Sequence, residues 1–436
     1  MIIIVLSKMF KKYFFLVYYL LLILILQLQQ SEVMPSTGIR IAFIVAVMWP
    51  LYSVRKEALP IVLSLFFTVT NYNFSYSYMP YEVYQYDILI ALGLVLGYHD
   101  KSLIKIKIPT FLYIWFFLVT VVDVAWSLKI NYLSYSILGT ILLWPYMNFG
   151  NSKLLKMMSL SVIVTGTVLA GSYLLFASKY AEAYTGGGGF EREGWTDPNY
   201  FGCAVGMGII AAGVEIVQKR YNILMKLIFG FTILIMFACL AMNASRGAIL
   251  AVGVSSLILI LVARIKSQYK VLFALMIVVM VIYLNDLGYF DLLKYRIEND
   301  DNGGSGRTII WITKIEAFFS DQNPLPYISC IFGLGLEEGR NLAQFRLVHT
   351  GFHNDFIAFL CEYGFVGLFI FIKWLWFPIS KATSNKLLVS AVIVYLTMCS
   401  MTLEPITAGR FSYFIFWLYA LQLAVSQTEI KKSIYE

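Results

Sequence analysis

Charged side chains are scarce in this sequence, and long hydrophilic stretches are nearly absent. Of its 436 residues 13% are charged and 60% are hydrophobic, whereas soluble globular domains carry about 25% charged residues. Apolar runs of roughly 17 to 25 residues, enough to cross about 30 Å of hydrocarbon as helix, recur from Tyr13 to the C-terminus. This pattern excludes a separate soluble catalytic domain and predicts an all-α, polytopic integral membrane protein.

Cofactor motifs are also missing. The five cysteines show no CxxC or Cys/His metal spacing, and four of them fall in or at the edge of apolar runs, as small buried residues do. Neither GxxxxGK[ST] nor GxGxxG occurs, so nothing indicates ATP or a dinucleotide. We therefore expect no cofactor and no metal.

The formal net charge of +8 does not predict nucleic-acid binding, because the basic residues form short clusters between apolar runs. Such clusters mark cytoplasmic connectors. Threading the chain on them gives about 14 spans, or 12 if residues 41–70 are not a full helical pair, with both termini inside. The N-terminal run lacks a small-residue cleavage site, so we expect an uncleaved first span.

The threading divides the chain into four parts. These are N-terminal helices in 1–178, central helices in 179–285 with a short outer loop at 179–199, a large periplasmic loop in 286–352, and C-terminal helices in 353–436. A connection as long as the third part is usually functional or disordered. Its stretch GSGRTIIWITKIEAFF has helical spacing.

Two arginines near predicted span ends are candidates for binding an anion. Arg246, in NASRGA, is either an interfacial arginine that reaches lipid headgroups or a guanidinium that holds phosphate oxygens bidentately. Arg307, in GGSGRTIIW, is either a solvated loop residue or a second cation near a helix N-terminus, where backbone N–H groups also favour anions. Together they could clamp a diphosphate.

His353 is the sharpest signal, since the chain has only three histidines. It caps the entry to the next span, and its roles are a hydrogen-bonded interfacial residue or a general base near neutral pH. A zinc site with His349 at i,i+4 is a third hypothesis, although no further ligand stands at a recognisable spacing. Asn354 and Asp355 lie in the first helical turn, where capping is expected.

Four other places have structural and functional interpretations. Glu362 lies nine residues after His353, about 13 Å along a helix, so it either serves function inside the membrane or holds a helix break before Gly364 and Gly367. Arg340 and Arg346 either steer an acidic substrate or are solvated loop residues. The segment 197–199 is expected to form a turn and N-cap, with contact to sugar as the other interpretation.

In combination these residues resemble the O-antigen ligase and O-antigen polymerase superfamily of membrane glycosyltransferases. The resemblance covers roughly residues 195–371 and rests on SRGA, on GRTIIW followed by FGLGL, and on HNDFIAFLCEYGFVGL, in that order. It implies a substrate, an undecaprenyl-diphosphate-linked glycan, and places the multi-pass protein in the bacterial inner membrane with a periplasmic active site. It assigns the diphosphate to Arg246 and Arg307, and the base to His353. Arg340, Arg346, Asn354 and Glu362 are our candidates for supporting roles.

The implied chemistry needs neither metal nor nucleotide, because polyprenyl diphosphate is already a good leaving group whose charge two arginines can stabilise. The acceptor distinguishes a polymerase, which extends another lipid-linked repeat unit, from a ligase, which uses lipid A-core. We favour a polymerase, since the tyrosine-rich N-terminal half suits adaptation to one repeat unit. The implied partners are the bilayer, a chain-length regulator and a flippase.

A transporter is the alternative from a different class. Transporters usually place charged or broken helices at the midplane and often contain internal repeats. Here ionisable residues inside spans are few, mainly Asp123, Glu215 and Glu362, and the informative residues gather on one face. That distribution favours chemistry at the membrane surface.

Overall fold

The computed structural model describes 107–144, 147, 149, 152–176, 198–218, 221–263, 267–298, 307–320, 326–343, 351–383, 385–407 and 411–425. Throughout these residues the regular structure is helical, and no strand occurs among them. The predicted all-α membrane fold is confirmed. Residues 1–106, which carry the first predicted spans, lie outside the described part, so the total span count stays a prediction.

The helices follow one another along the chain in a simple order. They are α5 (Thr110–Ser127), α6 (Tyr132–Leu143), α7 (Ser152–Phe176), α9 (Pro198–Val217), α10 (Ile223–Met242), α11 (Arg246–Val262), α12 (Ser267–Asp286), α13 (Asp291–Glu298), α14 (Arg307–Phe318), α15 (Pro326–Phe332), α16 (Gly335–Asn341), α17 (Asp355–Lys381), α18 (Lys386–Thr402) and α19 (Phe411–Val425).

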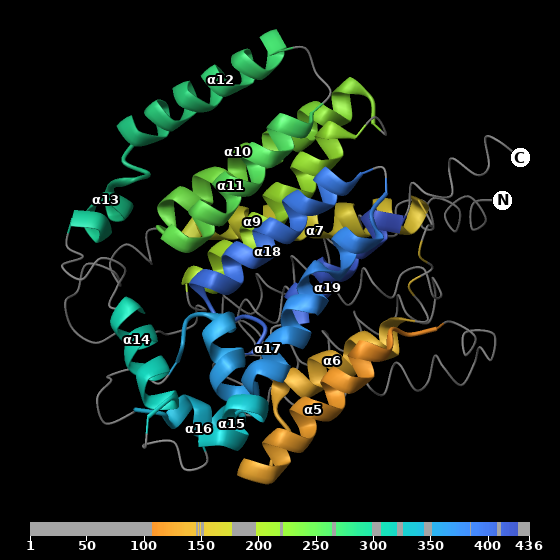
Figure 1. The fold of residues 1–436 in the computed structure, drawn as a ribbon. Coiled ribbons are helices and arrows are strands. Elements are labelled where there is room, and N and C mark those ends of the chain that lie inside the picture. The colour runs from red at the N-terminus through yellow and green to blue at the C-terminus, as the bar shows by residue number, and fades with distance from the viewer. Residues whose placement is uncertain are drawn as a thin grey trace, which may run out of the picture.

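Five of the described helices are long and apolar enough to cross a membrane, namely Thr110–Ser127, Leu154–Gly171, Asn199–Val217, Ile223–Met242 and Asp355–Lys381. Shorter apolar helices accompany them at Tyr132–Leu143, Arg246–Val262, Lys386–Thr402 and Ser412–Val425. α11 packs along α18, α9 packs against α7 and α10, and α17 contacts α18, α19 and α5 (Figure 1). The result is a bundle in which apolar helices face one another.

The centre of this bundle is aromatic. Trp374 of α17 stacks on Trp417 of α19 at 5.0 Å between ring centroids, and Trp115 of α5 lies 5.3 Å from Trp374. The Trp417 indole donates to the Trp374 carbonyl at 2.8 Å, so its polar atom is satisfied although the ring is fully buried. We call this cluster of three tryptophans the bundle core.

α17 is bent back on itself at Gly364, whose φ of 64° and ψ of −168° suit glycine alone. The rings of Phe359 and Phe371 stack at 4.3 Å, and those of Phe356 and Phe371 are 5.2 Å apart. In a continuous helix twelve residues would separate two rings by about 18 Å. Residues 355–363 are therefore a first arm that packs antiparallel to a second arm, residues 365–381.

This hairpin corrects the expectation that the chain enters hydrocarbon as one straight helix from His353. The second arm alone runs through the bundle, and Glu362 lies at the bend instead of 13 Å down a span. The interpretation of Glu362 as part of a helix break is confirmed, because the break follows two residues later.

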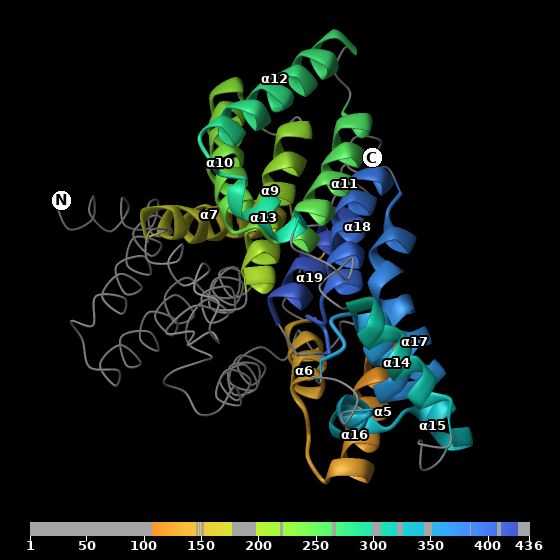
Figure 2. The same cartoon turned by 90° about the vertical axis from the view of Figure 1, so that its left-hand side faces the viewer.

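A second, smaller core lies where the large loop was predicted. Phe318, Leu334, Phe352, Ala358 and Cys361 pack together there. We call this set the cap core, and α14, α15, α16 and the first arm of α17 together the cap. Figures 1 and 2 show the cap at one end of the molecule beside α5. The predicted helix in GSGRTIIWITKIEAFF is confirmed as α14.

Candidate functional site

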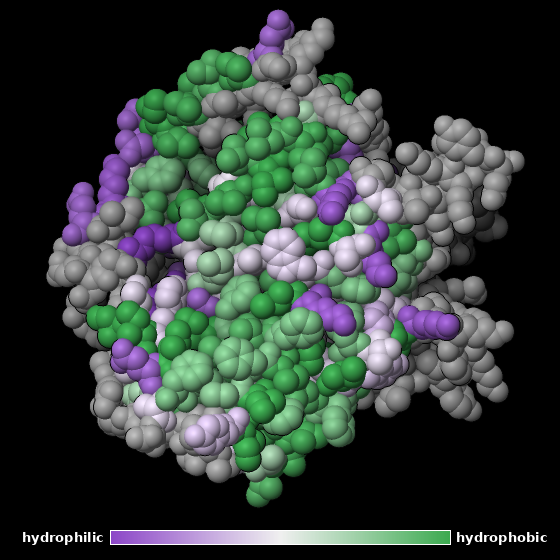
Figure 3. Space-filling view, in the orientation of Figure 1, coloured by the Kyte–Doolittle hydropathy of each residue, from purple (hydrophilic) through white to green (hydrophobic). Residues whose placement is uncertain are grey.

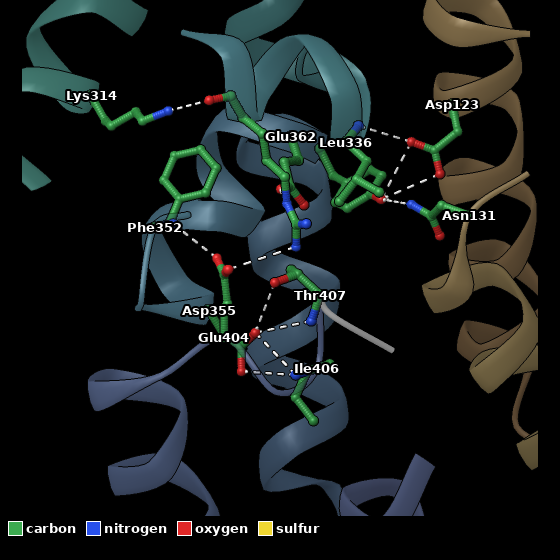
Figure 4. Close-up of polar contacts among 12 residues, drawn as sticks. Asp123, Asn131, Lys314, Leu336, Phe352, Asp355, Glu362, Glu404, Ile406 and Thr407 are labelled. Carbon is green, nitrogen blue, oxygen red and sulfur yellow. Dashed lines mark hydrogen bonds and ion pairs between the residues drawn. The ribbon is translucent and has the colours of Figure 1, made fainter. Parts of the chain in front are cut away.

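The residues at the end of α18 collect contacts from several distant parts of the chain. We call residues 401–407 the junction segment, because they connect α18 toward α19 and also contact α11, α14 and the start of α17. Figure 4 shows part of this cluster. Each of the three principal sequence candidates can be located relative to it.

Arg246 is the first residue of α11 and is half-buried. Its neighbour Gly247 faces the junction segment so closely that a Cβ there would lie 2.7 Å from the Thr402 hydroxyl oxygen. On the other side, the Ser245 hydroxyl donates to the Asn199 side chain at 3.2 Å. The glycine is needed for close approach, and the starts of α9 and α11 meet the end of α18 here.

Arg307 begins α14, and its guanidinium Nη1 donates to the Thr402 carbonyl at 2.6 Å. Carbonyls in the last turn of a helix lack intrahelical partners and carry partial negative charge, which a cation satisfies. The same residue, Thr402, is therefore contacted by the helix start that carries Arg246 and by the Arg307 side chain. The structure brings these two parts of the chain together.

His353 directly precedes α17 and has a φ of 51°, which is unusual for a residue other than glycine. The N-cap is the next residue, Asn354, whose Oδ1 accepts from the N–H groups of Phe356 at 2.9 Å and Ile357 at 3.2 Å. The expectation that His353 itself caps the helix is wrong, while the capping role of Asn354 is confirmed. The Asn354 amide also donates to the Met401 carbonyl at 3.2 Å, which fixes this turn to the junction segment.

Asp355 ties the first arm to the junction segment more strongly than capping would require. Its buried carboxylate accepts from the N–H groups of Ile406 at 3.1 Å and Thr407 at 3.0 Å, and from the Thr407 hydroxyl at 3.1 Å. Its own N–H donates to the Leu403 carbonyl at 3.0 Å. His353 thus stands on a backbone that is held on both sides of the turn.

Arg340 of α16 is an internal ion-pair residue. Its Nε lies 3.6 Å from a Glu362 oxygen, and its Nη2 lies 3.7 Å from a Glu404 oxygen. Burial by itself lowers the pKa of Arg340, but the two carboxylates outweigh that and raise it above the usual value. The interpretation of Arg340 as a solvated loop residue is wrong, because both of its partners are buried.

The FGLGL motif supplies the backbone that fits against the bend of α17. Leu334 donates its N–H to the Cys361 carbonyl at 3.0 Å. Gly333 has a φ of 81°, and a Cβ there would overlap the Glu362 backbone; a Cβ at Gly364 would overlap Ile331. Glycines at both positions let two chain reversals touch, and this contact holds Glu362 beside Arg340.

Two charged residues of the site were missed by the sequence reasoning. Glu404 accepts from the Phe352 N–H at 2.9 Å besides pairing with Arg340. Lys314 is fully buried in α14, donates to the Arg340 carbonyl and lies 4.9 Å from the centre of the Phe352 ring. Burial lowers the pKa of Lys314 to about 8, opposed by Glu362 and Glu404 among other groups. A lone acid before proline in MTLEPIT could have indicated Glu404; no local signal marks Lys314.

A second polar cluster lies at the other side of the bend. The Asp123 carboxylate accepts from the Leu336 N–H at 3.0 Å and from the Tyr363 hydroxyl at 3.3 Å. The Asn131 amide donates to the same Tyr363 oxygen, and its Oδ1 accepts from the Ser134 N–H at 3.1 Å. This cluster joins α5 and α6 to the cap (Figure 4). It gives Asp123 a structural role at the end of its helix.

Lys314 and Arg340 lie with Glu362 and Glu404, so two cations face two carboxylates. Arg246 and Arg307 are the first residues of α11 and α14, at the junction segment. Arg346 and His349 lie outside the described residues, so the steering and zinc hypotheses that use them remain untested. Within the described part, no group of three or more His, Cys, Asp or Glu side chains is placed to hold a metal ion.

Comparison with known proteins gives a family resemblance for part of the chain. No curated protein matches the chain, but residues 231–372 match the family model described as O-antigen ligase. The matched range holds Arg246, Arg307, Arg340, His353 and Glu362, and it includes most of the cap. Residues 231–372 are therefore similar to the O-antigen ligase family, which confirms the resemblance of the chain to the O-antigen ligase and polymerase superfamily.

Proposed function

We propose that this protein transfers a glycan from a polyprenyl diphosphate, of the undecaprenyl type, to a sugar hydroxyl. One observation carries the proposal: three parts of the chain meet at the junction segment. They are Arg307, the start of α11 with Arg246, and the turn with His353. These residues come from separate parts of one matched domain. Two guanidinium groups can bind a diphosphate, and an imidazole can accept the proton of a hydroxyl acceptor.

The roles follow from the chemistry of the bond that is exchanged. The bond between the anomeric carbon and the phosphate oxygen breaks, and the acceptor oxygen forms the new bond to that carbon. Arg246 and Arg307 stabilise the negative charge on the departing diphosphate, and the helix starts at the same place add favourable N–H dipoles. His353 accepts the proton of the acceptor hydroxyl. The diphosphate leaves attached to its lipid.

We assign the supporting roles from the contacts that these residues make. Arg340 is neutralised by Glu362 and Glu404, so we assign it to the positioning of the cap instead of to the diphosphate. Asn354 holds the His353 turn through its cap and its bond to Met401. Glu404 contributes to the same turn through the Phe352 N–H.

We place the active site on the periplasmic side of a bacterial inner membrane. Topology and charge support this placement: the second arm of α17 leads away from the junction segment to Lys381, and α18 starts again at Lys386. Basic residues of this kind mark the cytoplasmic ends of spans. The junction segment, at the opposite end of α18, then faces outward.

For the acceptor we propose a second lipid-linked repeat unit, which makes the protein a polymerase. The support is the tyrosine-rich N-terminal half, which lies outside the matched domain and suits adaptation to one particular glycan. A chain-length regulator and a flippase are the expected partners. A ligase, with lipid A-core as acceptor, is an outcome that the following experiment distinguishes.

The test is the lipopolysaccharide ladder of a deletion strain of the native host, complemented with wild type, His353→Ala or His99→Ala. We expect the deletion to leave core plus one repeat unit, and only His353→Ala to fail in restoring the ladder at equal protein level. His99, in a predicted cytoplasmic connector, is the matched control. Bare core with long glycan on the lipid carrier would make the protein a ligase. An unchanged ladder in the deletion strain would contradict the proposal and favour transport.

A further inference from the structure

In α15 the large apolar side chains are exposed and a small polar one is buried, which is the reverse of what a loop in water shows. Tyr327 is 90% exposed, and Ile328, Ile331 and Phe332 are each exposed by 45% or more, whereas Ser329 is fully buried. In an aqueous loop the large apolar residues would face inward. Small polar residues inside and large apolar residues outside are typical of helices that contact lipid.

α14 shows the same property on its outward face. Ile309, Ile312 and Phe319, which follow one another at helical spacing, are 54%, 53% and 51% exposed. The inward face already contains Ile310 and Phe318, which are buried. The inward side also holds buried Lys314, and Glu316 is the exposed acidic side chain among the outward residues.

α16 differs, although it follows α15 directly and has the same length of seven residues. Glu337 and Glu338 are exposed, and Glu337 pairs with exposed Lys129 at 3.3 Å. This face is suited to water. Two adjacent short helices of one loop therefore expose surfaces of opposite polarity.

The outward apolar face of α14 and α15 continues the exposed apolar face of the second arm of α17. The ring of Phe319, at the end of α14, lies 6.5 Å from that of Phe365 in the second arm of α17. Phe365 is 53% and Phe369 66% exposed. Figure 3 shows hydrophobic side chains over much of this face of the molecule, with hydrophilic side chains among them.

The position of α14 along the bundle supports the same conclusion. Its first residue, Arg307, contacts the junction segment, and Phe319 lies near Phe365. The first arm of α17 also starts at the junction segment, where Phe356 lies beside Phe371. The junction segment is therefore recessed from the level of Phe365 by about six residues of helix, or about 9 Å.

We propose that α14 and α15 are immersed in the bilayer, with Ile309, Ile312, Phe319 and Tyr327 against lipid hydrocarbon, while α16 faces water. The segment predicted as a periplasmic loop is then in part a membrane-embedded wall beside the second arm of α17. If the proposed function holds, a lipid-anchored diphosphate reaches Arg307 by moving within the plane of the membrane along α14. The immersion itself does not depend on that function.

The test uses Ile312→Cys, Tyr327→Cys and, as matched control on the water side, Glu338→Cys, each in lipid nanodiscs without substrate. A membrane-impermeant maleimide is added, and labelling of each peptide is followed by mass spectrometry, which separates the introduced thiols from the native cysteines. We expect labelling at positions 312 and 327 to be at least about tenfold slower than at 338, because a thiol in hydrocarbon does not ionise. After denaturation in detergent all three should label alike.

Equal and rapid labelling at all three positions in nanodiscs would overturn the proposal. Slow labelling in native membranes combined with rapid labelling in nanodiscs would also overturn it, since a protein partner would then cover the surface. Ile309→Cys and Phe319→Cys give the same measurement if the first two variants are not monodisperse. Because no turnover is measured, a negative labelling result does not contradict the proposed glycosyl transfer. A negative result in the ladder experiment likewise does not contradict the immersion of α14 and α15.

Discussion

The bundle core and the cap core are stabilised in different ways. In the bundle core, Trp115, Trp374 and Trp417 pack ring on ring and are fully buried. The cap core is small, and charged groups border it: Lys314, Arg340, Glu362 and Glu404 all contact it or one another. The cap therefore depends on ion pairs and backbone contacts that join distant segments.

The two regions differ in what they must hold in place. The bundle core belongs to a continuous apolar cluster that reaches Leu403 and Ile406, and it needs only packing. A cap that must hold the His353 turn needs directional contacts, which Asp355, Asn354 and Glu404 supply. Directional contacts fail sharply when one partner is removed, so the two regions should respond differently to substitution.

The largest effect is expected from Trp374→Ala in the bundle core. Removing a buried indole leaves a cavity among four aromatic neighbours, which costs about 3–5 kcal/mol. The loss should be global, lowering the thermal midpoint of the whole protein in detergent. Trp376→Ala is the matched control, since Trp376 is 44% exposed in the same arm and should change the midpoint little. Equal effects of both variants would show that the core is not where stability resides.

Arg340→Ala should come next, with a different pattern. It leaves the carboxylates of Glu362 and Glu404 without their ion-pair partner, at a cost of about 2–3 kcal/mol, less than for a fully buried pair because the side chain is 32% exposed. The effect should be local: hydrogen exchange should rise in α16 and the first arm of α17 and stay unchanged in α19. Lys129→Ala removes the exposed ion pair with Glu337. It is the control, and it should leave hydrogen exchange in α16 and in the first arm of α17 unchanged. Uniform exchange throughout the variant would contradict a separately stabilised cap.

The contrast between the regions also explains which features could be predicted from sequence. Hydrophobic run length predicts helices such as α10 and α18, because every residue of a run contributes to that signal. The capping role of Asn354 follows from local chemistry at a helix start. Both kinds of inference need only neighbours in sequence.

The bend of α17 could not be predicted in the same way. Gly364 indicates a break, but the reversal also needs Gly333 and Leu334 to fit against it from thirty residues upstream. The partners of Arg340 come from α17 and from the junction segment, and nothing in the local sequence of α16 indicates them. Interactions across such separations are set by tertiary packing.

A pH dependence is expected from Lys314 in the cap. Burial lowers its pKa from 10.5 to about 8, so between these values the unfolded chain binds more protons than the folded one. Stability then rises with pH through that range. Relative to Lys314→Met, the wild type should gain about 2 kcal/mol between about pH 7.5 and about pH 9.5. The measurement is the thermal midpoint of both proteins against pH, with exposed Lys381→Met expected to follow the wild type. Parallel curves for wild type and Lys314→Met would contradict a buried ammonium group.

The smallest effect is expected from Tyr363→Phe, at the cluster that joins α5 and α6 to the cap. The variant keeps the ring and removes the hydroxyl that donates to Asp123 and accepts from Asn131. Asp123 retains the Leu336 N–H, so the loss should be about 1 kcal/mol. Hydrogen exchange should increase at the start of α16 and leave the junction segment unchanged, because Glu404 and Asp355 are untouched. Asp123→Asn tests the same contact from the other side, and its effect in the double variant should be less than additive. Strict additivity would mean that the hydroxyl and the carboxylate act independently.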